Sequence, residues 1–232
     1  MGAWSVRRIH EIQKLTHAET YLEIGVNDGA TFFDIDLPYK DAVDPEFRFE
    51  HEAMSTDRVR FFQMPSDRFF GSHLPRARYD IVFLDGLHTV EQTFRDFLAT
   101  LVLSHEKTVW LIDDTVPCDV YSALRDQEQC LRERSRLGPQ SNGSWHGDVY
   151  KVVYAIHDFC PNLNYVTIID QGNPQTIVWR EPRESFAPSF ATLEDISRVS
   201  YFDMERHAEA MRIDTEAVCL TKLSSVLERM ST

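Results

Sequence analysis

Short apolar runs recur along the first half of the chain, and several of them end at a glycine, a proline or an acid. Their length suits buried strands better than helices. Helical spacing of apolar residues appears over residues 6–15 and 93–103, and we expect a further helix to begin at residues 30–33. Strands that alternate with helices predict a parallel sheet built from βαβ units. The five predicted strands span residues 20–26, 41–45, 59–64, 79–84 and 108–112.

The last third of the chain shows a different pattern. Two β-rich runs, residues 164–170 and 175–179, are joined by the short turn Gln171-Gly-Asn-Pro174. Such a turn predicts a hairpin, and therefore antiparallel strands at one end of the sheet. The polar residues 181–189 predict a loop. Residues 216–230 predict a helix with one apolar face, formed by Cys219, Leu223, Val226 and Met230.

These patterns together predict an α/β fold. We expect a single Rossmann-like, doubly wound sheet that is mostly parallel, with an antiparallel C-terminal hairpin strand and a helical C-terminal tail. Residues 1–180 would form the domain. Residues 181–232 would be a linker and a helical extension that packs on this domain or on a partner subunit in a homo-oligomer.

Composition narrows the class of protein. The 232 residues carry a formal net charge of −13, which argues against nucleic acid and anionic membranes as partners. No apolar run approaches the ~20 residues of a membrane helix, and the N-terminus lacks the apolar segment of a signal peptide. The four cysteines form no Cys-x-x-Cys pair, so we expect reduced, structural thiols in a cytoplasmic protein.

Acidic residues end two of the predicted strands. Asp85 follows one, with His88 three residues on, and the pair Asp113-Asp114 follows the other. Open parallel sheets bind ligands at the carboxyl ends of their strands. Three carboxylates there could share Mg²⁺ or Ca²⁺, and a histidine could take a proton. The alternatives are a helix N-cap for the acid pair and a surface loop for His88.

A glycine loop follows the first strand, in Glu23-Ile-Gly-Val-Asn-Asp-Gly29. Such glycines let the backbone approach a nucleotide-like ligand, and Asp44 lies about 20 residues on, where an acid binds ribose hydroxyls in dinucleotide folds. The alternative is a tight turn with a solvated Asp44. The loop departs from Gly-x-Gly-x-x-Gly, which favours a single nucleoside without phosphates.

An irregular segment, residues 138–147, contains turn-forming residues and Trp145. Long irregular loops are often functional, so this one could fold over the acidic edge as a lid. Trp145 would pack in the lid or stack on a substrate. Asp148 and Lys151 are expected to anchor the loop by an ion pair, with assistance to catalysis as the alternative.

Five motifs carry a resemblance to a known family: Glu23-Ile-Gly-Val-Asn-Asp-Gly-Ala-Thr31, Val43-Asp-Pro45, Ser66-Asp67, Phe83-Leu-Asp-Gly-Leu-His88 and Ile112-Asp-Asp114. In their order they resemble class I S-adenosylmethionine-dependent methyltransferases. The chain is most similar to the metal-dependent O-methyltransferases that modify antibiotic sugars, the macrocin group. The resemblance covers about residues 20–180.

The resemblance implies a role for each matching position. Asp44 would bind the ribose of S-adenosylmethionine, and Ser66 and Asp67 would lie near its adenine. Asp85 would lie beside the cofactor as well as bind metal, and His88 would be the general base. The loop from Gly25 to Gly29, with Asn27, would hold the methionine part, and Glu23 and Thr31 would also bind the cofactor. Those that bind Mg²⁺, or another divalent cation, would be Asp85, Asp113 and Asp114.

The sequence therefore predicts an S-adenosylmethionine-dependent, metal-assisted O-methyltransferase that acts on a hydroxyl of a small molecule, with Trp145 near the substrate. A metal would lower the pKa of the hydroxyl and orient it. Two other classes stay open. One is a non-catalytic cofactor-binding module that works through protein contacts. The other is a nucleotide-dependent oxidoreductase, for which the glycine pattern is poor.

Overall fold

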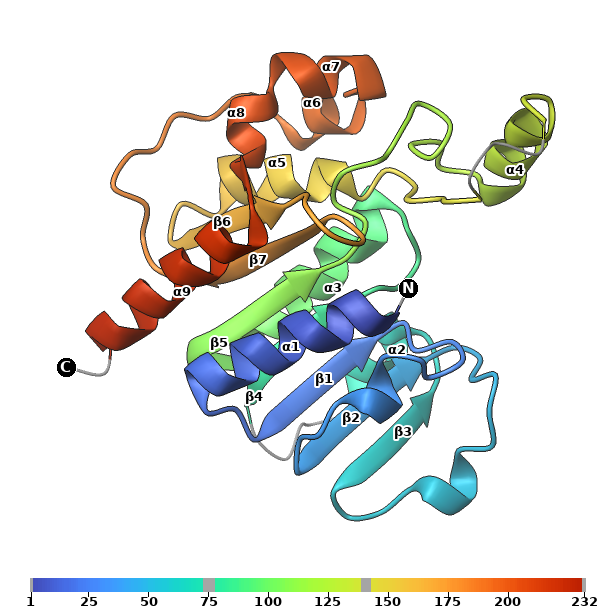
Figure 1. Ribbon diagram of the computed structural model, residues 1–232, viewed down its shortest axis with the longest axis vertical. Helices are drawn as coiled ribbons and strands as arrows, with labels where there is room; N and C mark the ends of the chain where they lie inside the picture. Colours follow the sequence, from blue (N-terminus) through green and yellow to red (C-terminus); the bar gives the residue numbers. More distant parts are fainter. Residues whose placement is uncertain (1, 73–77, 139–142, 231–232) are drawn as a thin grey trace.

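One sheet of eight strands organises the computed structural model, which describes residues 2–72, 78–138 and 143–230 (Figure 1). The strand order is β3-β2-β1-β4-β5-β7-β6-β8. The strands are β1 (Thr20–Ile24), β2 (Tyr39–Asp44), β3 (Val59–Gln63), β4 (Tyr79–Leu84), β5 (Ser104–Ile112), β6 (Leu163–Ile168), β7 (Gln175–Arg180) and β8 (Ile213–Asp214).

The first five strands are parallel, so their carboxyl ends meet at one edge of the sheet. Backbone hydrogen bonds hold those ends level, from Gly25 N to the carbonyl of Val43 (2.9 Å) and from Asp85 N to that of Ile24 (2.9 Å). The strand order reverses between β1 and β4, which is where open α/β sheets form a ligand crevice.

The C-terminal strands run differently. β7 is antiparallel to both β5 and β6, and β8 adds a short parallel pair to β6. The predicted fold, a mostly parallel α/β sheet with an antiparallel hairpin and a helical tail, is confirmed. The boundary expected at residue 180 stays a prediction, although β8, beyond it, joins the same sheet.

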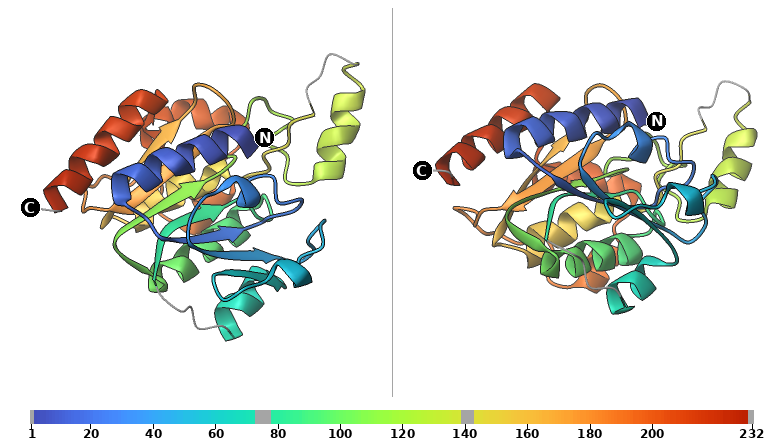
Figure 2. Two further views of the ribbon diagram at one scale, coloured as in Figure 1. Left: turned by 60° about the horizontal axis from the view of Figure 1, so that its bottom comes forward. Right: turned by 90° about the horizontal axis from the view of Figure 1, so that it is seen from below.

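Helices cover both faces of the sheet (Figure 2). α1 and α9 lie on one face, and α2, α3 and α5 on the other. Successive side chains of β4 point to opposite faces of the sheet. Ile81 and Phe83 belong to the hydrophobic core under α1 and α9, whereas Val82 and Leu84 belong to the core under α2, α3 and α5. The helices are α1 (Gly2–Thr16), α2 (Ser66–Ser72), α3 (Val90–Val102), α4 (Gln127–Ser135), α5 (Tyr150–Phe159), α6 (Leu193–Ser197), α7 (Tyr201–Arg206), α8 (Ala208–Met211) and α9 (Glu216–Met230).

The prediction that a helix begins at residues 30–33 was wrong. A single 3-10 turn, Phe32–Asp34, stands there, and β2 begins five residues later. Lys40 Nζ donates to the carbonyls of Phe32 and Ile35, both at 2.8 Å, so this turn is held by a side chain instead of a helical ladder. Packed aromatic rings fill the space of a helix here: Phe32, Phe33, Phe47, Phe49 and Phe61.

The expected apolar face of the last helix is correct except at its end. Cys219, Leu223 and Val226 are buried, whereas Met230 is 37% exposed and Leu227 takes its place in the core. None of the helices in the described part of the chain is long and apolar enough to span a membrane. α4 lies on an excursion away from the sheet (Figure 1).

Candidate active site

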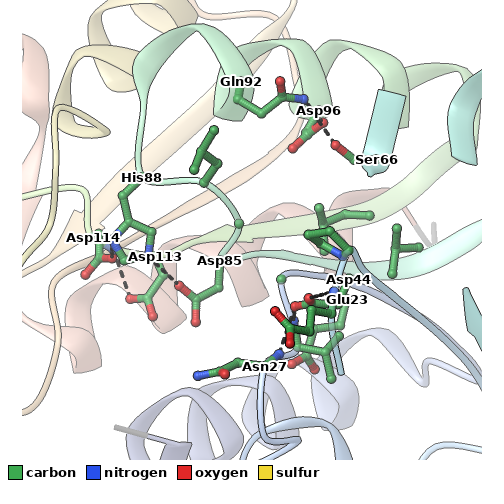
Figure 3. Close-up of a pocket in the computed structure, with 18 of the residues that line it drawn as sticks. Glu23, Asn27, Asp44, Ser66, Asp85, His88, Gln92, Asp96, Asp113 and Asp114 are labelled. Carbon is green, nitrogen blue, oxygen red and sulfur yellow. Dashed lines mark hydrogen bonds and ion pairs between the residues drawn. The ribbon is translucent and has the colours of Figure 1, made fainter. Parts of the chain in front are cut away.

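A cavity of about 810 Å³ opens at the carboxyl edge of the parallel strands. Side chains from the ends of five strands line it, together with residues from α3 and the segment around Trp145 (Figure 3). Gly29 is the one predicted site residue outside its lining, because its α-carbon faces Phe33 and Phe49. The predicted residues in the lining are Glu23, Gly25, Asn27, Thr31, Asp44, Ser66, Asp67, Asp85, His88, Asp113, Asp114 and Trp145.

The loop after β1 touches the loop after β4. Gly25 has φ +86°, and a Cβ there would lie 2.0 Å from the carbonyl oxygen of Asp85. Only glycine fits this contact without a backbone shift. The two loops are therefore held together as one floor of the cavity.

Asp44 organises the glycine loop. Its carboxylate accepts hydrogen bonds from the backbone N–H groups of Val26 (2.7 Å) and Asn27 (2.9 Å), and from Glu46 N (2.8 Å). The alternative of a solvated Asp44 in a plain turn does not hold, because this side chain is only 8% exposed. A carboxylate has about four acceptor sites, so one remains for a ligand hydroxyl.

Glu23 is the second buried acid near this loop. The hydroxyl of Tyr21 donates to its carboxylate at 2.6 Å, and burial raises the pKa of Glu23 well above its usual range. The cavity wall beside the glycine loop therefore holds a carboxyl group that tends to keep its proton.

Asp85, His88 and Asp114 bring one ligand atom each within 4.8 Å of one another. His88 bridges the acids, with Nδ1 2.9 Å from Asp114 and Nε2 3.5 Å from Asp85. Two carboxylates and an imidazole are a donor set that suits divalent cations. Asp114 also has φ +60°, a conformation that Asp tolerates better than most residues.

Electrostatics bind this cluster tightly. Burial alone would lower the pKa of His88, but hydrogen bonds and attraction from Asp114 and Asp85 outweigh it and raise that pKa to about 11. Burial raises the pKa of Asp85 to about 6. Burial opposes ionisation of Asp114 as well, yet the contact with His88 keeps its pKa below the usual value. These contacts favour the charged form of the imidazole, which would compensate the two acids.

Asp113 was expected beside Asp114 as a ligand, but it lies outside this three-residue cluster. Its Oδ1 accepts from Asn173 Nδ2 (2.6 Å) and Gln175 Nε2 (3.1 Å), and burial raises its pKa. Asn173 Nδ2 also donates to Asp114 at 2.6 Å. Neither amide was identified from the sequence, where residue 173 read only as part of a turn.

Trp145 stacks on His88, with ring centroids 4.7 Å apart and planes 15° from parallel. Its indole N–H donates to the carbonyl of Leu124 at 2.6 Å. Gly147 has φ +59°, and a Cβ there would lie 1.8 Å from the carbonyl oxygen of His88. The segment thus packs on the histidine. Four residues of the expected lid, 139–142, lie outside the described part of the chain.

The expected ion pair behind this segment is present. Lys151 Nζ lies 3.2 Å from Asp148 Oδ2, and Asp148 Oδ1 accepts from Val90 N at the start of α3. Both side chains are buried and do not line the cavity. They anchor the Trp145 segment to the helix that follows the Asp85 loop.

Residues that the sequence did not indicate close the other end of the cavity. Gln92 and Asp96, one turn apart on α3, face Ser66 at the start of α2 (Figure 3). Gln92 Nε2 donates to Ser66 Oγ (3.1 Å) and to Asp96 Oδ1 (3.0 Å). The sequence did not indicate Asp96 as a site residue, because an acid within a helix is usually exposed to solvent. Its position in the helix does not by itself show that the side chain faces a cavity.

Residues 22–115 match the family model described as a methyltransferase domain. This segment holds the glycine loop, Asp44 and the acids Asp85, Asp113 and Asp114. Asn173 and Trp145 lie beyond it. No curated protein matches the sequence.

Solved O-methyltransferase structures share the fold at low sequence identity. TomG from Streptomyces achromogenes, an O-methyltransferase involved in tomaymycin synthesis and solved in complex with SAM, is 16% identical with a TM-score of 0.54; the match covers 78% of this chain and 81% of that one. An O-methyltransferase from Bacillus cereus in complex with SAH is 15% identical with a TM-score of 0.50, over 77% and 80% of the chains. Residues 22–115 thus resemble a methyltransferase domain, and the solved structures show that the chain shares the fold of these O-methyltransferases.

Proposed function

We propose that the protein is an S-adenosylmethionine-dependent O-methyltransferase that acts, with a divalent metal, on a hydroxyl of a small molecule. One observation carries the proposal. A single cavity joins the glycine loop, the acid at the end of β2 and the cluster of Asp85, His88 and Asp114. A methyl donor and an activated hydroxyl could therefore meet there.

The cofactor would lie over the glycine loop. Gly25 allows close approach of the backbone, and Asp44 has an acceptor site for a ribose hydroxyl. The acid-rich lining suits a ligand that carries a sulfonium and an ammonium group. Bound there, the cofactor would supply the methyl group that is transferred.

Asp85 and Asp114 would hold the metal, with Asp113 as the third acid proposed from the resemblance. Bound there, the metal would act as a Lewis acid that makes a substrate hydroxyl more acidic. Asn173 and Gln175 hold Asp113, and Asn173 also holds Asp114, so the acids keep fixed positions before any ligand arrives.

His88 could take the hydroxyl proton only as a neutral imidazole, a form that a divalent cation shared by Asp85 and Asp114 would favour by repelling the imidazolium charge. Both nitrogens now face carboxylates, and the stacked ring of Trp145 fixes the plane of the imidazole. A base in this place contributes roughly 10²–10⁴-fold to a rate. Trp145 would also separate the reacting groups from solvent.

The acceptor class proposed is a sugar-containing or phenolic natural product, as in the macrocin group. The resemblance supports it, and so does the likeness of the fold to TomG, an O-methyltransferase involved in tomaymycin synthesis. We further propose that the enzyme works in the cytoplasm, which agrees with four cysteines that form no disulfide in the described part of the chain. We also propose that α9 joins two copies.

The test measures methyl transfer from labelled S-adenosylmethionine to a panel of catechols and glycosylated compounds. It is run with Mg²⁺, with excess chelator, and with the variant Asp85→Asn. We expect a methylated product that disappears with chelator and falls at least tenfold in the variant. Product formation that persists at the full rate in chelator would remove the metal from the proposal.

Binding assays separate the two other classes. Calorimetry should detect S-adenosylhomocysteine but not NAD, since an oxidoreductase would prefer NAD. Tight cofactor binding with no product from any acceptor, and no Mn²⁺ binding, would favour a non-catalytic module. His88→Ala should lower turnover and leave the affinity for S-adenosylhomocysteine nearly unchanged.

A further inference from the structure

Asp96 is a buried acid that neither the fold nor the proposed chemistry uses. It lies on α3, is 2% exposed and lines the cavity. Among the described residues it takes part in no ion pair within 4 Å. Burial raises its pKa to about 6, while hydrogen bonds from Ser66 and Gln92 lower it.

A buried carboxylate without a cation is costly unless hydrogen-bond donors satisfy it. Asp96 has two neutral donors from the protein, the amide of Gln92 and the hydroxyl of Ser66. Its oxygens can accept about four hydrogen bonds. Because Asp96 lines the cavity, a ligand that offers an N–H group could use the remaining capacity.

The sheet indicates which part of the cofactor would reach this acid. Along the carboxyl edge, the cluster of Asp114 and His88 comes first, then Gly25 after β1, Asp44 after β2 and Ser66 after β3. A cofactor with its reactive carbon near His88 and its ribose at Asp44 must place its purine toward Ser66. Figure 3 shows Ser66 and Asp96 together at that end, away from His88.

Gly86 borders this corner. A Cβ at that position would lie 3.8 Å from Asp96 Oδ2, so the acid reaches up to the loop that follows β4. The corner is therefore bounded by the loop of Gly86, the start of α2 and α3, with a carboxylate at its base.

We propose that Asp96, held in place by Ser66 and Gln92, reads the 6-amino group of the adenine ring of S-adenosylmethionine. This assignment rests on the proposed cofactor. The amino group would donate an N–H to the carboxylate. A purine without that group leaves the buried acid with one donor fewer, and a hydrogen bond to a charged group is stronger than one between neutral groups.

The experiment compares two ligands by calorimetry: S-adenosylhomocysteine and its analogue with hydrogen in place of the 6-amino group. The wild-type protein should bind S-adenosylhomocysteine at least tenfold more tightly than the analogue. In Asp96→Leu, which has similar volume but no acceptor, this ratio should fall to about one. Asp96→Asn keeps one acceptor oxygen and should give an intermediate ratio.

Asp158→Asn is the matched control. Asp158 is also a buried acid, but it accepts from the backbone N–H groups of Ser189 and Phe190 and does not line the cavity. Its variant should keep the wild-type ratio. Circular dichroism reports folding, and if Asp96→Leu does not fold, Asp96→Asn decides.

The outcomes are distinct. A wild-type protein that binds neither ligand contradicts the proposed function. Equal affinity for both ligands in the wild type overturns the assignment of an amino-group reader. A wild-type ratio that survives in the folded Asp96 variants shows that another residue reads the amino group, and Asp96 then only links α3 to α2.

Discussion

Gly25 makes a tight backbone contact in the candidate site. In Gly25→Ala the new methyl group would collide with the Asp85 carbonyl, and φ would be strained as well. We expect affinity for S-adenosylhomocysteine to fall more than tenfold and the melting temperature to drop. Calorimetry and thermal unfolding measure both.

Gly71→Ala serves as the control for that substitution. Gly71 lies in α2, and a Cβ there would meet no atom within 4 Å. Alanine in a helix is favoured over glycine by roughly 0.5–1 kcal/mol, so this variant should be as stable as the parent or more so. Equal behaviour of the two variants would mean that the loop contact is unimportant.

Asp44 gives a second prediction at this scale. Asp44→Ala leaves three backbone N–H groups without their acceptor and removes the site for a ribose hydroxyl. Affinity for S-adenosylhomocysteine should fall more than tenfold, which is about 1.4 kcal/mol. Asp44→Asn keeps one acceptor oxygen and should lie between the two. An unchanged titration in Asp44→Ala would remove this residue from the site.

Single residues also show where sequence reasoning stops. His88 and Asp85 could be paired from a spacing of three residues after a strand. Asn173 could not, because it meets Asp113 across 60 residues of chain and only the β5–β7 pairing brings them together. Asp96 needed the packing of α3 on α2 before its burial was visible.

Among the elements, β1, β4 and β5 are tied at their amino ends by one acid. Asp80 accepts from the N–H groups of Glu19 and Thr20, from the Thr20 hydroxyl and from His105. Burial acts against it, but these hydrogen bonds win and lower its pKa to about 2, below the usual 3.8. Asp80 therefore sets the register of three neighbouring strands.

The lowered pKa predicts a pH dependence of stability. The contribution of Asp80 should be complete above pH 4 and disappear as pH falls toward 2, because protonation costs more in the folded state. Partial exposure reduces the effect to about 1 kcal/mol. The difference in unfolding free energy between the parent and Asp80→Asn, measured in urea, should shrink from pH 7 to pH 3. A constant difference would contradict the linkage.

The secondary structure was predicted correctly where the hydrophobic periodicity was strong. The prediction failed where the connection between two strands was too short to hold a helix. The strand expected over residues 79–84 has those bounds in the structure. The segment after Gly29 has helix-compatible residues, but β2 begins at Tyr39 and Pro38 precedes it. Too few residues remain between Gly29 and Tyr39 for a helix and a loop back to the sheet. The short connection therefore prevents a helix although the local residues are compatible with one.

At the scale of the whole molecule, Arg8 in α1 connects α9 to the candidate site. This buried guanidinium donates to Glu216 at the start of α9 (2.8 Å) and to Gln175 (2.7 Å), as well as to backbone carbonyls of the β6–β7 turn. Asn173, in that turn, and Gln175, the first residue of β7, both donate hydrogen bonds to Asp113. The acids are thus positioned partly from outside the matched domain.

We therefore expect Arg8→Met to be strongly destabilising. It would leave Glu216 buried without its inner partner and free several carbonyls, and breaking such a pair costs about 3–5 kcal/mol. Arg7 also bonds Glu216 but is 42% exposed, so Arg7→Met should cost less than about 1 kcal/mol. Urea unfolding of the two variants checks the contrast, and similar losses in both would refute the special position of Arg8.

The reach of Arg8 has a consequence for how the protein is made. Its partners lie 165 and 208 residues farther along the chain, so they leave the ribosome long after α1 does. At a synthesis rate of about 5–20 residues per second, these partners are made roughly 10–40 s after Arg8. The segment with the methyltransferase domain match is complete by residue 115. The nascent chain would thus carry Asp85, Asp113 and Asp114 before Asn173 and Gln175, which hold Asp113, are made.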